Sequence, residues 1–199
     1  MNSQLALAEL LGLLCAEGSH IIAYSSYWDK SGDKLRYVKN KRSERIEFYN
    51  KDSKLLNRLK DLLFAAFDYH ASITKDNKIN IGKRKTIGEI ITHTELGHLK
   101  WKVPFFVKCG SDNIKIAFIR GFFDGDGTCI NRIRFFSTNI NGLKDVSVLL
   151  QHLNFKHTIQ KPIIKQNRKP CYTLQVSERK KETFLNTIKP ISKRPVLRG

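Results

Sequence analysis

The sequence predicts an α+β protein that contains two copies of one αββαββα unit. Three observations support this prediction: two apolar segments that each end on an acidic residue and a glycine, a second stretch of similarity downstream of each, and the same order of expected elements in both copies. The chain has 199 residues, of which 41% are hydrophobic, and this is enough for a sizeable core. We expect a first half over residues 1–98, a linker over residues 99–110 and a second half over residues 111–199.

The repeat is clearest at the two acidic motifs. The segment "LLGLLCAEG" (Leu10–Gly18) aligns with "IRGFFDGDG" (Ile119–Gly127) at an offset of 109 residues. Downstream, "RIEFYNKDSKLLNRLKDLL" from Arg45 aligns without gaps with "RIRFFSTNINGLKDVSVLL" from Arg132, at an offset of 87. The first copy therefore has 22 extra residues between its motif and this strand.

The elements of the first copy follow from capping residues and apolar spacing. Ser3 is a suitable N-cap for a helix that runs to about Ala16. The alternating residues 20–50 predict a long hairpin with its turn near Gly32. A helix near 53–67, two strands within 71–81 and a short last helix complete the unit.

The second copy has the same order with a shorter hairpin. Ser111 or Asp112 caps its first helix, and residues 129–137 form the hairpin. A helix near 141–153, two strands within 158–176 and a short last helix follow. Gly18 and Gly127 are expected to end the two motif helices in the left-handed conformation.

One face of each sheet is predicted to be buried and the other polar. Apolar and charged residues alternate from Arg45 to Phe48 and again from Arg132 to Phe135. Phe48, Phe135 and Phe184 are expected in the core, whereas His70 and His157 are expected in a loop or at the start of a strand. The polar face is rich in Arg, which suits a groove.

The composition indicates a polyanionic partner. Lys and Arg total 36 against 18 Asp and Glu, which gives a formal net charge of +18. Nucleic acid is favoured over a membrane, since no run approaches the roughly 20 apolar residues that span a bilayer. Four scattered cysteines fit neither a zinc site nor a disulfide framework. We expect an intracellular protein of the cytoplasm or nucleoid, because no secretory signal or transit pattern is recognisable.

Small residues four apart predict close packing of the two motif helices. Gly12 and Ala16 form such a pair in the first helix, and Gly121 and Gly125 in the second. If these stripes meet, Glu17 and Asp126 converge at the negative ends of both helix dipoles, at a cost of about 0.3–1 kcal/mol for each carboxylate. A divalent cation such as Mg²⁺ would neutralise the pair, and it commonly uses one or two protein carboxylates together with water and phosphate oxygens.

Two alternatives compete with a metal site. An acidic residue followed by glycine is also ordinary turn chemistry at a helix end, although two equivalent copies on a basic chain weigh against that reading. The stretch "DGDGTCINRIRF" resembles the start of an EF-hand loop, but Cys129 occupies the glycine position and Phe135 the position of the last Glu.

With both motifs in place, the chain resembles the LAGLIDADG homing endonucleases in their single-chain, two-motif form. "LKWKVPFFVK" before the second motif is similar to the link between halves in that family, while Cys15 and Glu17 depart from its usual acids. The resemblance implies a saddle of two four-stranded antiparallel sheets around a central two-helix seam. It also implies hydrolysis of one phosphodiester per strand at a long asymmetric site, with short 3′ overhangs.

The resemblance also implies the site residues. Glu17 and Asp126 would bind the metal, with Ala16 and Gly125 directly before them at the same site. Mg²⁺ is the expected ion, Mn²⁺ an alternative and Ca²⁺ a non-productive substitute. Polar groups around the catalytic waters would be Lys102, Lys193, Lys51 and Thr138. DNA contacts are expected from Arg36, Lys39, Arg45, Lys78, Asn80, Arg132, Arg134, Lys161, Arg168 and Gln175, and Tyr24, Tyr27 and Trp28 are further candidates.

We therefore expect a monomeric, free-standing and intron-encoded DNA endonuclease. Two alternatives share the same saddle: a maturase or splicing cofactor that binds intron RNA, and a non-catalytic DNA-binding regulator. The presence of an acid at both motif ends favours the nuclease.

Overall fold

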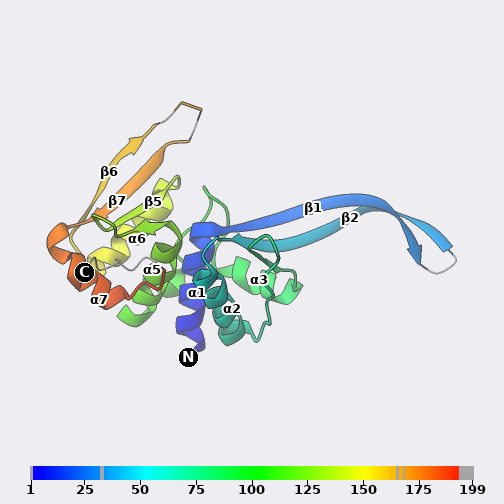
Figure 1. Ribbon diagram of the computed structural model, residues 1–199, viewed down its shortest axis with the longest axis horizontal. Coiled ribbons are helices and arrows are strands. Elements are labelled where there is room, and N and C mark those ends of the chain that lie inside the picture. The colour runs from blue at the N-terminus through cyan, green and yellow to red at the C-terminus, as the bar shows by residue number, and fades with distance from the viewer. Residues whose placement is uncertain (1, 32–33, 165, 168, 193–199) are drawn as a thin grey trace.

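The computed structural model describes residues 2–31, 34–164, 166–167 and 169–192. Two helices of 15 residues each lie side by side at the centre, α1 (Ser3–Glu17) and α5 (Asp112–Asp126). An antiparallel sheet extends from the end of each helix, and the remaining helices pack beneath the sheets (Figure 1). The predicted α+β fold of two related halves around a two-helix seam is confirmed.

The first half contains a three-stranded sheet. Its elements after α1 are β1 (Gly18–Ser31), β2 (Lys34–Tyr49), α2 (Ser53–Phe67), β3 (Lys78–Ile81) and α3 (Arg84–His93). The strands pair in the order β1-β2-β3, all antiparallel. The expected long hairpin and the helix at 53–67 are both present.

A fourth strand in the first sheet was expected within residues 71–81, and that expectation is wrong for the described residues. Ile73 makes only an isolated bridge to Ile79. Asn77 has φ 57°, and its N–H donates to the carbonyl of Thr74. The chain turns back immediately after this bridge, so no ladder can extend.

The second half contains the expected four strands. Its elements after α5 are β4 (Gly127–Thr128), β5 (Arg134–Ser137), α6 (Ile140–His152), β6 (His157–Ile163), β7 (Cys171–Val176), a 3₁₀ turn η1 (Glu178–Lys180) and α7 (Lys181–Ile188). The strand order is β4-β5-β7-β6. The segment between the halves includes the short helix α4 (Phe105–Lys108).

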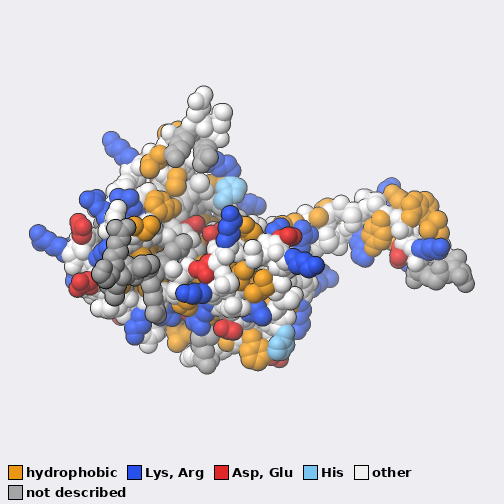
Figure 2. Space-filling model, in the orientation of Figure 1, with side chains coloured by type: hydrophobic (Ala, Val, Ile, Leu, Met, Phe, Trp, Pro, Cys, Tyr) orange, Lys and Arg blue, Asp and Glu red, His pale blue; other side chains and the backbone are white. Residues whose placement is uncertain are grey.

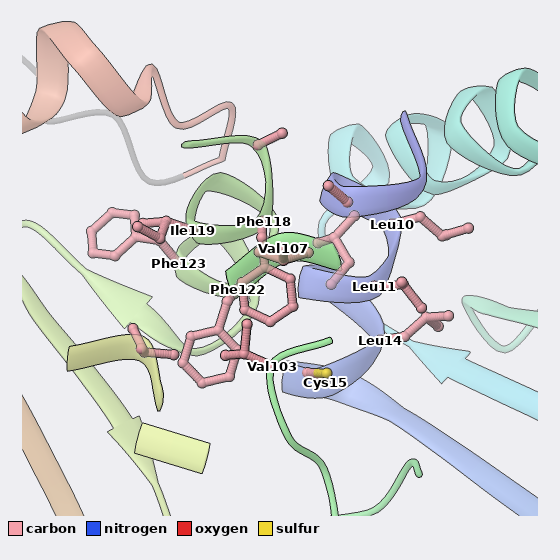
Figure 3. Close-up of a cluster of buried hydrophobic side chains, with 14 of the residues drawn as sticks. Leu10, Leu11, Leu14, Cys15, Val103, Val107, Phe118, Ile119, Phe122 and Phe123 are labelled. Carbon is pink, nitrogen blue, oxygen red and sulfur yellow. The ribbon is translucent and has the colours of Figure 1, made fainter. Parts of the chain in front are cut away.

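The core lies between the motif helices and the inner faces of the sheets. Phe48, Phe135 and Phe184 are fully buried, as predicted. Aromatic rings connect the seam to the second sheet, with 5.0 Å between the ring centroids of Phe123 and Phe135. Figure 3 shows the seam cluster, in which side chains of α1 meet those of α5 and of the linker; its labelled members are Leu10, Leu11, Leu14, Cys15, Val103, Val107, Phe118, Ile119, Phe122 and Phe123.

The ends of the motif helices differ from expectation in two details. Asn2, and not Ser3, is the N-cap of α1, because its side chain accepts a hydrogen bond from the N–H of Gln4 at 2.9 Å. Gly18 and Gly127 are extended, with φ −81° and −97°, so the left-handed prediction is wrong. Each helix passes directly into a strand. Glycine is needed there for space, since a Cβ would lie 2.5 Å from the Leu14 carbonyl oxygen and 2.2 Å from the Phe123 ring.

None of the helices in the described part of the chain is both long and apolar enough to cross a membrane.

Candidate DNA-binding and metal site at the helix seam

The two motif helices cross with backbone against backbone. A Cβ on Gly12 would lie 2.2 Å from the carbonyl oxygen of Phe118, and one on Gly121 would lie 2.1 Å from that of Glu9. The contacts are reciprocal, because Phe118 and Gly121 stand at the repeat positions of Glu9 and Gly12. The seam is therefore a local two-fold axis that only glycine permits at its centre.

This crossing brings the acidic ends of the helices together. Glu17 is the last residue of α1, and Asp126 is the last residue of α5. A Cβ on Gly125 would lie 2.4 Å from the Cβ of Ala16 and 3.3 Å from the Cγ of Glu17. Glu17 and Asp126 are partly exposed, whereas Gly125 is buried between the helices. Both carboxylates can thus reach a ligand above the seam.

Two further acids at the seam are buried, and the sequence reasoning did not identify either as structural. Glu9 is 2% exposed, and its carboxylate accepts from Arg58 Nε at 2.6 Å and Nη2 at 2.7 Å. Arg120 Nη1 also donates to Glu9, at 3.2 Å. The hydrogen bond to Glu9 raises the pKa of Arg58 and keeps it cationic. The only sequence signal was an acid inside an otherwise apolar helix.

Asp124 is the second buried acid, with 1% exposure. Its carboxylate accepts from the backbone N–H groups of Ile191 and Ser192 at 2.9–3.0 Å. It therefore holds the segment that follows α7 against the seam. At the equivalent position in α1 stands Cys15, and burial raises the pKa of its thiol to about 12. Cys15 is consequently a neutral packing group.

The expected lysine and threonine positions lie around the strand ends and the linker. Lys102 has an exposed side chain, and its backbone N–H donates to Thr94 Oγ1 at 3.1 Å. Lys51 is exposed directly after β2, and Thr138 follows β5 and donates to the carbonyl of His98 at 3.0 Å. Lys193 lies outside the described residues.

The predicted DNA contacts in the first half lie on strands. Arg45, in β2, donates to Glu47 at 2.7 Å, and Asn80, in β3, pairs with Glu47 across the ladder. Their neighbours Ile46 and Phe48 are buried, so Arg45, Asn80 and Lys78 occupy the outer face. Arg36 and Lys39 are exposed in the distal part of β2.

Two of the predicted contacts in the second half, Arg134 and Gln175, are hydrogen-bonded to each other. Arg134 Nε donates to Gln175 Oε1 at 3.0 Å, across the β5–β7 ladder. Gln160 also donates to Gln175, at 3.2 Å. Arg132 and Lys161 are exposed, and Arg168 lies outside the described residues. A surface hollow is lined by Arg132 and Gln175 among others, but neither Glu17 nor Asp126 lines it.

The seam suits a hard cation better than a closed metal centre. No group of three or more His, Cys, Asp or Glu side chains that could hold a metal occurs among the described residues. Two carboxylates alone leave most of a coordination shell to water and to a ligand. This donor set fits Mg²⁺ or a similar ion.

Comparison with known proteins agrees with this architecture. Residues 113–189 match the family model of the LAGLIDADG-like domain. No curated protein sequence matches the chain significantly. Mesophilic variants of the homing endonuclease I-DmoI are similar in structure, with 21% identity, coverage of 94% of this chain and 97% of theirs, and a TM-score of 0.68.

Two further solved structures share the fold. I-DmoI in complex with DNA and Ca has 20% identity and a TM-score of 0.65, over 94% of this chain and 91% of that one. The N-terminal LAGLIDADG domain of DUF199/WhiA has 16% identity and a TM-score of 0.58, over 99% and 86%. The resemblance inferred from the two motifs is thus confirmed as a LAGLIDADG fold, and the second half matches the LAGLIDADG-like domain itself.

Proposed function

We propose that this protein is a sequence-specific DNA endonuclease that cuts both strands of a long asymmetric site with the help of a divalent cation. The observation that carries the proposal is the meeting of two pseudo-symmetric helix ends, each bearing a partly exposed carboxylate, beneath two basic sheets. One carboxylate for each DNA strand is an arrangement that suits a double-strand cut.

Glu17 and Asp126 would hold the metal, with the backbone of Ala16 and Gly125 beside it. Such a cation lowers the pKa of a bound water and stabilises the charge that develops on the leaving oxygen. Water and phosphate would be oriented by side chains at the strand ends and in the segments after α3 and α7. These side chains are Lys102, Lys51, Thr138 and Lys193. The buried glycine seam fixes the separation of the two carboxylates, because the helices cannot slide without a backbone clash.

The outer sheet faces would bind duplex DNA. Arg45, Arg134 and Gln175 present planar groups that can pair with guanine or adenine edges in the major groove. Exposed lysines such as Lys161 suit phosphate contacts, which position the protein without reading sequence. The net charge of +18 provides the long-range attraction. The I-DmoI structures with target DNA and with Mn, Ca or Mg support this assignment by analogy of fold.

The proposal is tested by separating binding from cleavage. Duplexes that bind in Ca²⁺ are selected from a random library, and the recovered site is then incubated with Mg²⁺. We expect Glu17→Gln and Asp126→Asn each to lower the cleavage rate at least about a thousandfold, because each removes a charged metal ligand. Affinity for the site measured in Ca²⁺ should change less than about tenfold, since most binding energy comes from the sheets.

Glu89→Gln is the matched control, because Glu89 is a partly exposed acid on α3 that pairs with the exposed Lys85. It should cut at the wild-type rate. Normal cutting by either seam variant would refute the catalytic assignment. Specific binding without any cutting by the wild type would point to the non-catalytic regulator, and preferential binding of structured RNA would point to the maturase.

A further inference from the structure

The β1–β2 hairpin extends far beyond the body of the protein (Figure 1). Strands β1 and β2 have 14 and 16 residues, whereas the longest strand of the second half, β6, has seven. At about 3.3 Å per residue, β1, which begins at the end of α1, is roughly 46 Å long, and β6 is roughly 23 Å long. With base pairs about 3.4 Å apart, these lengths correspond to about 14 and 7 base pairs. We name residues 24–42 the arm.

The pairing of β1 with β2 is irregular at the start of the arm. Ser25 pairs with Lys41, but the next pair is Tyr27 with Val38, so β2 has one residue more than β1 in this stretch. Asn40 has φ 51°, and its N–H donates to Ser26 Oγ at 3.0 Å. This is a β-bulge held by a side chain. Bulges bend a ribbon and increase its twist, which lets a ribbon follow a helical groove.

Beyond the bulge, large apolar side chains are exposed to solvent. Trp28 and Tyr37 pair across the ladder with their ring centroids 5.0 Å apart, yet they remain 64% and 50% exposed. Leu35, the partner of Lys30, shares their face and is 64% exposed. Figure 2 shows hydrophobic side chains gathered toward the far end of the arm, with basic side chains beside them. An apolar patch of this kind marks a surface that binds something.

The charge of the arm identifies the class of partner. Residues 27–42 contain six Lys and Arg and two Asp. The opposite face of the ribbon carries Tyr27, whose hydroxyl accepts from Lys41 at 2.7 Å, and the exposed Arg36. A two-stranded β-ribbon fits the major groove of B-DNA, where apolar side chains contact thymine methyl groups and cations reach the phosphates on both sides.

We infer that the arm binds duplex DNA outside the segment covered by the saddle, on the side of the first half only. The footprint of the protein is then lopsided, with the arm adding affinity and base preference on one flank. The inference rests on the proposed function for its ligand, but it depends on binding and not on cleavage.

The test uses the duplex recovered by selection in Ca²⁺, extended to about 40 base pairs and shortened stepwise from each end. For the wild-type chain, removal of one flank beyond about seven base pairs from the centre should weaken binding about tenfold or more, while the same removal at the other end has little effect. Equal effects at both ends, or none at either, would overturn the inference.

Two arm variants connect this asymmetry to the named residues. Arg36→Gln/Lys39→Gln removes two exposed cations and leaves the aromatic pair in place. It should weaken binding to the long duplex about tenfold, and it should make the slope of log affinity against log salt concentration shallower by about 2. Trp28→Ala should abolish the preference for thymine in the flank. On the duplex without the flank, both variants should differ from wild type by less than about twofold.

The control is Lys54→Gln/Lys85→Gln, which removes the same charge from exposed positions on α2 and α3. It should match wild type on both duplexes. If the arm variants instead lose affinity for a single-stranded RNA competitor more than for the duplex, the DNA assignment is wrong. Asymmetric binding without cleavage in Mg²⁺ would support the arm inference and refute the nuclease proposal. Cleavage with equal effects at both flanks would support the nuclease proposal and refute the arm inference.

Discussion

At the scale of single residues, two seam glycines decide whether the two halves can meet. Gly12 and Gly121 have no space for a methyl group, because the facing helix backbone lies where a Cβ would be. Gly125 faces side-chain atoms of Ala16 and Glu17 one turn further on, and Gly18 faces the Leu14 carbonyl of its own helix, whereas Gly12 and Gly121 face the backbone of the other helix. Backbone cannot move aside as a flexible side chain can, so these positions are intolerant of substitution.

Gly121→Ala should therefore destabilise the protein by about 2–4 kcal/mol, because overpacking against the Glu9 carbonyl forces α1 and α5 apart. Gly88→Ala is the control, since Gly88 lies inside α3 and nothing is within 4 Å of its Cβ position. That variant should gain about 0.5–1 kcal/mol from helix propensity. Urea unfolding measures both, and equal stabilities for the two variants would contradict the close crossing.

At the scale of elements, a buried ionic network joins three helices and the end of a fourth. Glu9 of α1 accepts from Arg58 of α2 and Arg120 of α5, and Arg120 Nε also donates to the carbonyl of Ile188 at the end of α7, at 2.7 Å. Each cation has a partner, so the network is satisfied. Its geometry fixes how α2 and α7 sit against the seam.

Glu9→Ala should cost about 3–5 kcal/mol, because it leaves two guanidinium groups partly buried without their carboxylate. Glu89→Ala breaks only an exposed pair, with 3.9 Å between Lys85 Nζ and Glu89 Oε1, and should change stability by less than about 0.5 kcal/mol. Chemical denaturation of both variants gives the comparison. A loss below 1 kcal/mol for Glu9→Ala would mean that the network contributes specificity and little stability.

At the scale of the whole molecule, the halves are bound too closely to behave as separate domains. Ser192 Oγ donates to Asp52 Oδ2 at 2.5 Å, which joins the end of the second half to the N-cap of α2 in the first. Trp101 from the linker packs on Phe122 of α5, with ring centroids 4.8 Å apart. The same body is asymmetric outside the seam, since the arm extends from the first half and the described strands of the second half are shorter.

One cooperative unfolding transition follows from this. Tryptophan fluorescence, whose change on unfolding comes mainly from the buried Trp101 because Trp28 is already 64% exposed, and far-UV circular dichroism should give coincident urea curves. A fragment of residues 1–110 should show no cooperative transition, because it exposes the apolar face of α1 that α5 covers. Two resolved transitions in the full chain would show that the seam is weaker than its packing indicates.

The sequence by itself determined the repeat, the two motif helices, the helix at 53–67, the long first hairpin and the two acids at the seam. These features depend on periodicity and on residues close together in the chain. Only the tertiary structure decided the missing fourth strand, the extended Gly18 and Gly127, the network around Glu9 and the bulge in the arm. Glu9 finds partners 49 and 111 residues away, and its role is set by what surrounds it in space. No local pattern carries that information, because an acid in an apolar helix has the same appearance in sequence whether it binds a ligand or an arginine.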